Sequence, residues 1–388
     1  MTAILNDADI AIAGAGPAGQ ALASLLIRGG FPAARIAVFD AKTAEQSQQD
    51  VRTIALSAGS RQILEQAGGW PVRATAIHEI HVSRRGHFGR TLIRHDDYQL
   101  PALGYVARYG DIIRPLEQAL QPSKLQFLRP VKITGLQEQH DHVQIQTISA
   151  DGQTRQYAAG MVIQAEGGTF TDQEARGQRR DYGQTAVIAH VCFSGSIAHR
   201  AFERFTDQGP LALLPEDDGY ALVWCVRPEL AEQLMQLDDA AFCAALQQAF
   251  GQRLGSISSI SARNAFPLGL NAQHSASARI VSIGNAAQTL HPVAGQGLNL
   301  GLRDVSVLAR AILQNGTQTE AAIQDFMRLR GTDRQLTIGL TDTLARIFAS
   351  SPDGSLRQTL LGSGLALLDM LPPARHALAG HMMYGWRN

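Results

Sequence analysis

The sequence predicts an α/β fold: a Rossmann-like, three-layer domain with a parallel sheet, an inserted sheet that is mostly antiparallel, and a helical C-terminus. Three observations predict it. First, three apolar runs that resemble buried strands, far apart in the sequence, each end in a glycine turn. Second, short strand-like segments follow one another between residues 183 and 264. Third, apolar residues have the spacing of a helix beyond Ile323. The carboxyl ends of parallel strands meet at one edge, so these turns predict a dinucleotide site.

The first glycine turn follows the apolar run Ile10–Ala13 and precedes a helix that ends at Gly29. It fits G-x-G-x-x-G, and its residues are Gly14, Gly16, Pro17, Ala18 and Gly19. A second strand then ends in Asp40, about 20 residues beyond Gly19, where a carboxylate binds an adenosine ribose. Strand, turn, helix and acid together predict a dinucleotide-binding βαβ unit.

Two later turns have the same construction. Glu166, Gly167 and Gly168 follow the apolar run Met161–Ala165, and the stretch from Gly284 to Asp304 follows Ile280–Ile283. The second of these turns ends in a glycine-rich helix start, where backbone N–H groups and the helix dipole favour an anionic or polarisable ligand. We therefore expect all three turns to contact one ligand.

Composition restricts the class of protein. The 388 residues are 45% hydrophobic and carry 34 basic against 34 acidic side chains, so the chain can form two domains and has no net charge that would recruit nucleic acid. Cys192, Cys225 and Cys243 form neither a C-x-x-C pair nor a metal-ligand spacing. We expect unbridged thiols, no metal site, no membrane span and a cytoplasmic location.

Short strands are expected in the inserted sheet, with a helix after them; they cover Thr185–Val191, Ala201–Phe205, Pro210–Leu214 and Tyr220–Val226, and the helix covers Asp238–Phe250. Such a sheet is a natural floor for a substrate cavity. The expected domain ranges are 1–76, 104–182 and 265–330 for cofactor binding, 77–103 and 183–264 for substrate, and 331–388 for a C-terminal helical segment. The apolar piece Leu356–Leu371 either packs on the body or contacts a membrane surface or a partner.

Three motifs resemble the single-component FAD-dependent aromatic hydroxylases, and within them the ubiquinone-biosynthesis branch. They are the turn at Gly14, the segment Asp50-x-Arg52-x-Ile-Ala-Leu-Ser, and the stretch from Gly284 to Asp304. The resemblance covers essentially the whole chain. More narrowly, Arg200–Thr206 and Gly209–Pro215 are similar to the 2-polyprenyl-6-methoxyphenol hydroxylases of that pathway.

The resemblance implies FAD as the cofactor and assigns roles at matching positions. The first turn would hold the pyrophosphate, Asp40 the ribose, and Arg52 the middle of FAD, although a solvated surface arginine is the alternative for Arg52. Glu166 keeps the carboxylate of the family's middle motif, but Phe170 replaces a serine there. Asn285 replaces an aspartate whose bond to the ribityl chain an amide oxygen can also accept.

The flavin ring is assigned to the last motif. Pro292 would lie beside the ring, and N–H groups at the following helix start would stabilise negative charge on reduced flavin. These N–H groups belong to Gly295, Gln296, Gly297, Leu298 and Asn299. A general base for a phenol is not defined by any motif, and His291 and His190 are candidates by position only.

The implied reaction is hydroxylation of the ring of a polyprenylated methoxyphenol in ubiquinone biosynthesis. NAD(P)H, a transient co-substrate, reduces FAD, O2 adds at C4a, and the hydroperoxide transfers oxygen to the ring. The expected partners are the polyprenylphenol, O2 and other ubiquinone-synthesis proteins, with at most peripheral membrane contact. Two alternatives are a flavin-dependent reductase or oxidase on the same scaffold and a non-catalytic FAD-binding subunit of a ubiquinone-synthesis complex.

Overall fold

A parallel sheet carries the glycine turns. The computed structural model describes residues 8–85, 90–166, 179–271, 276–288, 296–316, 318–349, 380, 383 and 384. The strand order is β19-β12-β1-β2-β8. The strands are β1 (Ile10–Ala13), β2 (Ile36–Phe39), β8 (Gln126–Leu128), β12 (Met161–Gln164) and β19 (Ile280–Ser282). Every pairing is parallel, which confirms the predicted parallel sheet.

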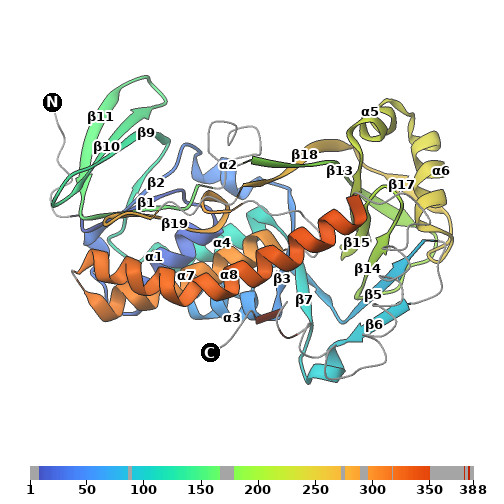
Figure 1. Ribbon diagram of the computed structural model, residues 1–388, viewed down its shortest axis with the longest axis horizontal. Helices are drawn as coiled ribbons and strands as arrows, with labels where there is room; N and C mark the ends of the chain where they lie inside the picture. The colour runs from blue at the N-terminus through green and yellow to red at the C-terminus, as the bar shows by residue number, and fades with distance from the viewer. Residues whose placement is uncertain are drawn as a thin grey trace.

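Alternate residues of these strands pack against different layers, and Figure 1 shows helices on one face of the sheet and the small sheet on the other. Ile12 and Ile163 belong to a core shared with helices, whereas Ala11 and Val162 belong to a core shared with a three-stranded antiparallel sheet. The helices are α1 (Pro17–Arg28), α3 (Ala58–Gln66), α4 (Tyr109–Leu120), α7 (Gln296–Asn315) and α8 (Thr319–Ala349). The small sheet consists of β9 (Val131–Glu138), β10 (Val143–Ser149) and β11 (Thr154–Ala159). The predicted three layers are therefore present.

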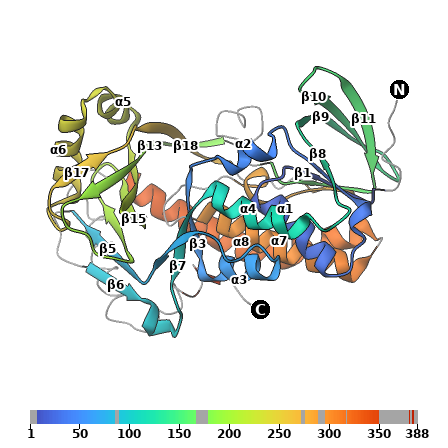
Figure 2. The same ribbon diagram turned by 180° about the vertical axis from the view of Figure 1, so that it is seen from behind.

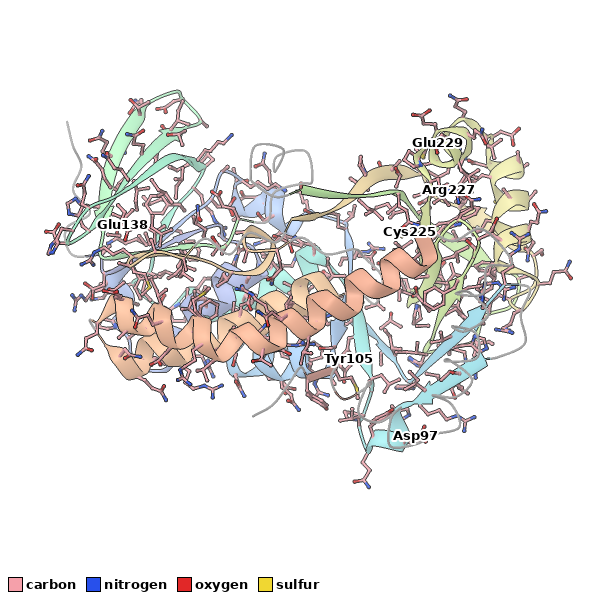
Figure 3. The ribbon with its side chains drawn as sticks, in the orientation of Figure 1. Asp97, Tyr105, Glu138, Cys225, Arg227 and Glu229 are labelled. Atoms are coloured by element: carbon pink, nitrogen blue, oxygen red, sulfur yellow. The ribbon has the colours of Figure 1, made fainter. Side chains whose placement is uncertain are left out.

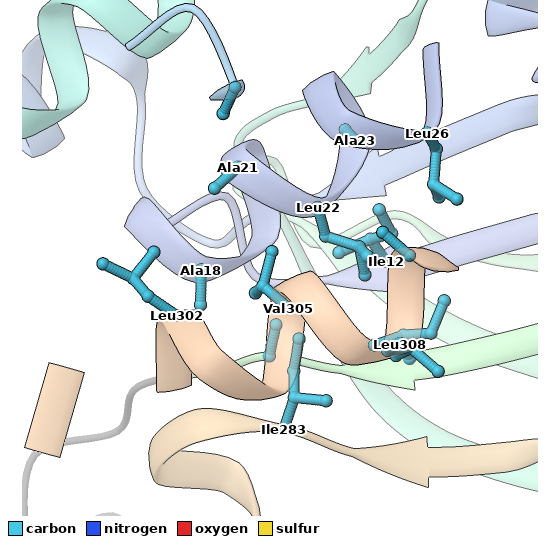
Figure 4. Close-up of a cluster of buried hydrophobic side chains, with 14 of the residues drawn as sticks. Ile12, Ala18, Ala21, Leu22, Ala23, Leu26, Ile283, Leu302, Val305 and Leu308 are labelled. Carbon is cyan, nitrogen blue, oxygen red and sulfur yellow. The ribbon is translucent and has the colours of Figure 1, made fainter. Parts of the chain in front are cut away.

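A close helix contact on this sheet joins α1 and α7, which are far apart in the sequence. Leu22 and Leu26 of α1 meet Val305 and Leu308 of α7 in a cluster from which water is excluded (Figure 4). Their three- and four-residue spacing gives each helix an apolar stripe, and burying it supplies the main driving force for packing. Figure 2 shows α4 and the short helix α2 (Ala44–Gln48) on the side of α1 away from the viewer in Figure 1.

The inserted sheet is large and mostly antiparallel, as predicted. Its order is β17-β13-β16-β15-β14-β5-β6, with β18 paired to β13, and β14 with β5 is its parallel pair. The strands are β5 (Glu79–Arg84), β6 (Arg90–Arg94), β13 (Arg179–Phe193), β14 (Arg200–Phe205), β15 (Pro210–Glu216), β16 (Gly219–Val226), β17 (Ile257–Ile260) and β18 (Asn264–Asn271). Helices α5 (Pro228–Gln236) and α6 (Asp239–Phe250) cover its outer face, and Asp238 caps α6.

A fourth sheet, β3-β7-β4, lies between the parallel sheet and the inserted sheet and was not predicted as such. Its strands are β3 (Thr53–Ser57), β4 (Ala74–Ile77) and β7 (Gly104–Arg108). Elsewhere in the chain, short 3-10 helices cover Ala33–Arg35, His95–Tyr98 and Gly284–Ala286. Several expected domain limits fall inside elements: residues 183, 265 and 331 lie within β13, β18 and α8. The domain ranges therefore stay a prediction.

The predicted C-terminal helix begins as α8, and the apolar piece Leu356–Leu371 lies outside the described residues. In the part of the chain that the structure describes, none of the helices combines the length and apolarity needed to cross a bilayer.

A buried charge cluster fixes α8 to the third glycine turn. Asp304 of α7 is fully buried; its carboxylate accepts a hydrogen bond from the Gly284 backbone N–H at 3.1 Å and from Arg330 Nε at 2.8 Å. Arg334 donates to the same carboxylate at 2.7 Å. Both arginine side chains are at least 96% buried, so their burial depends on nearby carboxylates: Asp304 accepts from both, and the buried Asp333 also pairs with Arg330.

We expect Asp304→Asn to destabilise the fold by about 3–5 kcal/mol, because it leaves Asp333 as the one carboxylate that the described residues place beside the buried guanidinium groups of Arg330 and Arg303, and it removes the acceptor of Arg334 Nη2. The measurement is the free energy of unfolding from urea titration. Asp325→Asn on α8 is the matched control, since Asp325 pairs with Arg328 at the surface and its loss should have little effect. Equal unfolding midpoints for the two variants would contradict the assigned role of Asp304.

Candidate functional site

The three glycine turns converge at one edge of the parallel sheet, as predicted. β1 pairs with β12, and β12 with β19, so Gly14, Glu166 and Gly284 follow neighbouring strand ends. Gly14 has φ +107° and Gly284 has φ +58°, conformations that favour glycine. A Cβ atom on Gly14 would lie 2.9 Å from the Glu166 backbone nitrogen. The first and middle turns are thus in direct backbone contact.

The first turn leaves the start of α1 open to a ligand. Gly16 occupies the N-cap in an extended conformation, Pro17 follows, and no side chain caps the helix. The first-turn N–H groups of Ala18 and Gly19 therefore lack a capping acceptor, which is the condition for binding a phosphate. Gly19 must be glycine because a Cβ atom there would lie 1.9 Å from the Gly14 carbonyl oxygen.

Asp40 follows β2 beside this turn. Its carboxylate accepts hydrogen bonds from the Ala15 N–H and the Lys42 N–H, each at 2.7 Å. Each oxygen keeps a second lone pair, so Asp40 both fixes the turn and can still accept a ribose hydroxyl.

Arg52 lies beside the first turn, and 44% of its side chain is exposed to solvent. Its guanidinium forms a two-pronged pair with Asp50, with Nε to Oδ1 at 2.9 Å and Nη2 to Oδ2 at 2.8 Å, and it stacks on the Tyr109 ring at 4.7 Å. A Cβ on Gly16 would be 2.7 Å from the Tyr109 hydroxyl. Burial raises the pKa of Tyr109 to about 12, so this hydroxyl keeps its proton and can donate to an anion. No sequence motif indicated a role for Tyr109.

The third turn packs against α1 and α7 through small residues. A Cβ on Gly301 of α7 would lie 3.0 Å from the Gly284 Cα, and one on Gly284 would lie 3.9 Å from the Ala18 side chain. Asn285 is exposed, and its Oδ1 is 3.7 Å from where a Cβ on Gly297 would be. The Asn285 amide therefore lies at the first turn of α7, within the predicted ring site.

Asn299 has a structural role in its side chain. Its Oδ1 accepts hydrogen bonds from the Ser57 N–H at 2.8 Å and the Ser60 hydroxyl at 2.6 Å, and its Nδ2 donates to the Ala55 carbonyl at 2.9 Å. The side chain thus joins α7 to β3 and α3, and only the Asn299 backbone remains for a cofactor. Leu298 packs partly against the helix core. Gln296 begins α7, while His291, Pro292 and Gly295 lie outside the described residues.

His190 lies at the end of the inserted sheet. Its Nε2 is 3.3 Å from the Glu216 carbonyl oxygen and 3.9 Å from Asp218 Oδ1, and Cys192 Sγ is 4.0 Å from its Nδ1. The fold therefore gathers a His, a Cys and an Asp that the sequence spacing did not suggest, with ligand atoms within 4.8 Å of one another. The Asp218 side chain is 84% exposed, and His190 already has a backbone partner.

The turn between β15 and β16 joins the inserted sheet to the cofactor side. Glu216 Oε1 accepts a hydrogen bond from the Thr53 hydroxyl at 2.9 Å, and Asp217 pairs with Arg108 at 2.9 Å and with Arg73 at 3.4 Å. Thr53 directly follows Arg52, so the inserted sheet is anchored next to the first glycine turn.

The cradle fits a dinucleotide. Its glycines lie where Cβ atoms would collide with backbone, its helix start has no side-chain cap, and its three turns meet at one sheet edge. These features were predicted from the sequence as a set, whereas the roles of individual residues in holding FAD stay predictions.

Comparison with known proteins indicates the same cofactor, FAD. Residues 7–326 match the family model described as an FAD binding domain. The ubiquinone hydroxylase UbiL of Rhodospirillum rubrum is 30% identical over 396 residues, which cover 97% of this chain and 89% of that protein. The 3-demethoxyubiquinol 3-hydroxylase of Escherichia coli is 32% identical over 323 residues, 81% of each chain.

A solved structure has the same fold. PqsL, a probable FAD-dependent monooxygenase from Pseudomonas aeruginosa, superimposes with a TM-score of 0.72 at 22% identity, covering 92% of this chain and 98% of its own. At that identity the likeness concerns the fold alone.

We expect Gly19→Ala to weaken FAD binding at least about tenfold, because the added methyl group forces the Gly14 carbonyl out of the turn. Flavin absorbance per mole of purified protein and a fluorescence titration with FAD measure the loss. Gly331→Ala on α8 is the control, since a Cβ there would meet nothing within 4 Å. Full FAD occupancy in Gly19→Ala would show that this turn does not hold the cofactor.

Proposed function

The chain belongs to the family of FAD-binding monooxygenases, and from that premise we propose that it hydroxylates the ring of a polyprenylated methoxyphenol in ubiquinone biosynthesis, with NAD(P)H as reductant. The balanced reaction consumes the phenol, O2, NAD(P)H and a proton, and yields the hydroxylated phenol, NAD(P)+ and water. FAD, when bound, carries the two electrons and supplies the activated oxygen. The choice of substrate is supported by the two relatives that are named as hydroxylases of ubiquinone compounds.

The cradle supports the cofactor side of this proposal. Backbone N–H groups at the start of α1 hold the pyrophosphate, Asp40 accepts from the ribose, and Arg52 with Tyr109 covers the phosphates from the side. Asn285 accepts from the ribityl chain. Glu166 contributes its backbone next to Gly14, and the start of α7, from Gln296 to Asn299, faces the ring edge that becomes negative on reduction.

The inserted sheet supports the substrate side. Its inner face, the one opposite α5 and α6, carries mainly apolar residues, and Ala201 and Leu214 on it pack with Ile77 of β4 and Val106 of β7. An apolar face next to the cofactor suits a prenylated ring. It also excludes the water that would favour release of peroxide without hydroxylation of the ring. We place the protein in the cytoplasm, with peripheral membrane contact at most, where it meets its substrate and other ubiquinone-synthesis proteins.

The test is a turnover with 18O2. Purified protein is reduced anaerobically with NADH or NADPH, mixed with 18O2 and a short-chain 2-prenyl-6-methoxyphenol, and the product is analysed by mass spectrometry. We expect a product that carries labelled oxygen on the ring, in proportion to the NAD(P)H consumed.

Two other outcomes separate the alternatives. Consumption of the phenol without label in the product would indicate a flavin-dependent reductase or oxidase. Bound FAD with no turnover of any polyprenylphenol, and only peroxide formed, would indicate a non-catalytic FAD-binding subunit.

A further inference from the structure

The inner face of the inserted sheet contains a carboxyl group that the cofactor cradle does not use. Strand register defines the two faces. Phe202, Leu213 and Leu222 form a cross-strand row in the core beneath α5 and α6, and Arg204 Nε donates to the Ala249 carbonyl of α6 at 3.1 Å. Glu203 lies between Phe202 and Arg204 on β14, so its side chain is on the opposite, inner face.

The neighbours of Glu203 on that face are mainly apolar, and Arg84 of β5, in register with Phe205, is a charged side chain in the next row. Its own cross-strand row is Ile188, Val223, Ala212, Glu203 and Val82. The row on one side contains Ala201, Leu214 and Ala221, and the row on the other side contains Phe205, Pro210 and Cys225. Three of these neighbours, Ala201, Ala212 and Ala221, are alanines, so the sheet itself places little side-chain bulk around Glu203. Figure 3 shows Cys225 on this sheet, at the opposite end of the molecule from Glu138 of β9.

Glu203 has no protein partner for its reactive atom. Its Oε1 is buried and makes no hydrogen bond in the part of the chain that the structure describes. Removal from water raises the pKa of Glu203 to about 7, and no cation offsets that effect. An unsatisfied buried carboxyl is costly, so it persists where a ligand supplies the missing partner.

We propose that Glu203 is the catalytic base of the reaction: Oε1 binds the phenolic hydroxyl of the substrate and takes its proton. The inference rests on the proposed function, because it requires a phenol at the inner face. Proton transfer to Oε1 raises the electron density of the ring, which favours attack of a ring carbon on electrophilic oxygen. Once the ring C–H proton has been released, Glu203 returns its proton to the phenol oxygen, so the residue is unchanged after each turnover.

Other titratable groups on this face are less suited to that task. Burial raises the pKa of the Cys225 thiol of β16 well above its usual range, and the charge of Glu203 raises it further. His190 of β13 lies at the sheet end with the Glu216 carbonyl as its partner. Arg84 of β5 is a permanent cation, and Arg108 of β7 is paired with Asp217. Glu203 alone combines burial, an unsatisfied oxygen and a proton affinity matched to neutral pH.

The expected pH dependence follows from the ionisation of Glu203. Only the carboxylate accepts a proton, so single-turnover hydroxylation by the wild type should rise as the pH increases through about 7. Glu203→Gln should lower the rate about a hundredfold at pH 8 and remove this rise. FAD content and the rate of anaerobic reduction by NAD(P)H should stay unchanged in this variant. Glu232→Gln, the same change on the outer helix α5, is the control.

A second measurement tests the contact without turnover. Infrared difference spectra of the FAD-loaded protein below pH 7 report the C=O stretch of a protonated buried carboxyl. We expect this band to shift when 2-geranyl-6-methoxyphenol binds, to stay when its O-methyl ether binds, and to be missing in Glu203→Gln. Since the band is measured in the wild type, the contact is tested even where the variant fails to fold.

The outcomes separate this inference from the proposed function. Normal 18O incorporation by Glu203→Gln with an unchanged pH profile, or an infrared band that does not respond to the phenol, overturns the role of Glu203 alone. A band that shifts with the phenol while the wild type never incorporates 18O overturns the hydroxylase function and leaves the Glu203 contact in place.

Discussion

Parallel pairing of β1, β12 and β19 is the constraint on which the site depends. It brings strand ends from the beginning, middle and last third of the chain to one edge, where Gly14 lies against the backbone of Glu166, and Gly284 lies beside Gly301 and Ala18. Backbone contact at that distance leaves no room for side chains, so the cradle consists of N–H groups and helix starts. Such groups have fixed positions and need no reorganisation when charge arrives.

The elements that were predicted best from the sequence are those whose local pattern of apolar residues agrees with the core contacts that the element makes. β1, β12 and β19 are short apolar runs before glycine, and α7 has an apolar stripe that meets α1. β9 was missed because its pairing with β10 shifts register between Gln146 and Thr147, which interrupts the alternation that identifies a strand. β3 and β7 are short and were missed because most of their stabilising contacts come from each other and from distant helices.

The candidate site shows the same division. Glycine spacing and the position of Asp40 could be read locally, because a turn needs its glycines in place whatever surrounds it. The stack of Arg52 on Tyr109 and the pairing of Asp304 with Arg330 and Arg334 could not, since they join residues of different elements. Glu203 was not predicted as a site residue, for another reason. Alternation in Arg200–Phe205 suggests one buried and one solvated face, but this strand is buried on both faces.

Burial on both faces also explains why one carboxyl can differ so much from its neighbours. Glu216 lies one strand away at the sheet end, where Thr53 donates a hydrogen bond to its carboxylate and Arg108 lies 3.6 Å from it, and it serves as an anchor. Glu203 has mainly apolar neighbours, and its Oε1 has no hydrogen-bond donor among the described residues, so burial raises the pKa of the same functional group there to about 7. The anchor at Glu216 keeps the inner face next to the cradle, and the absence of a donor at Glu203 gives that face its chemistry. Position within the sheet, rather than residue type, thus separates a structural carboxylate from a reactive one.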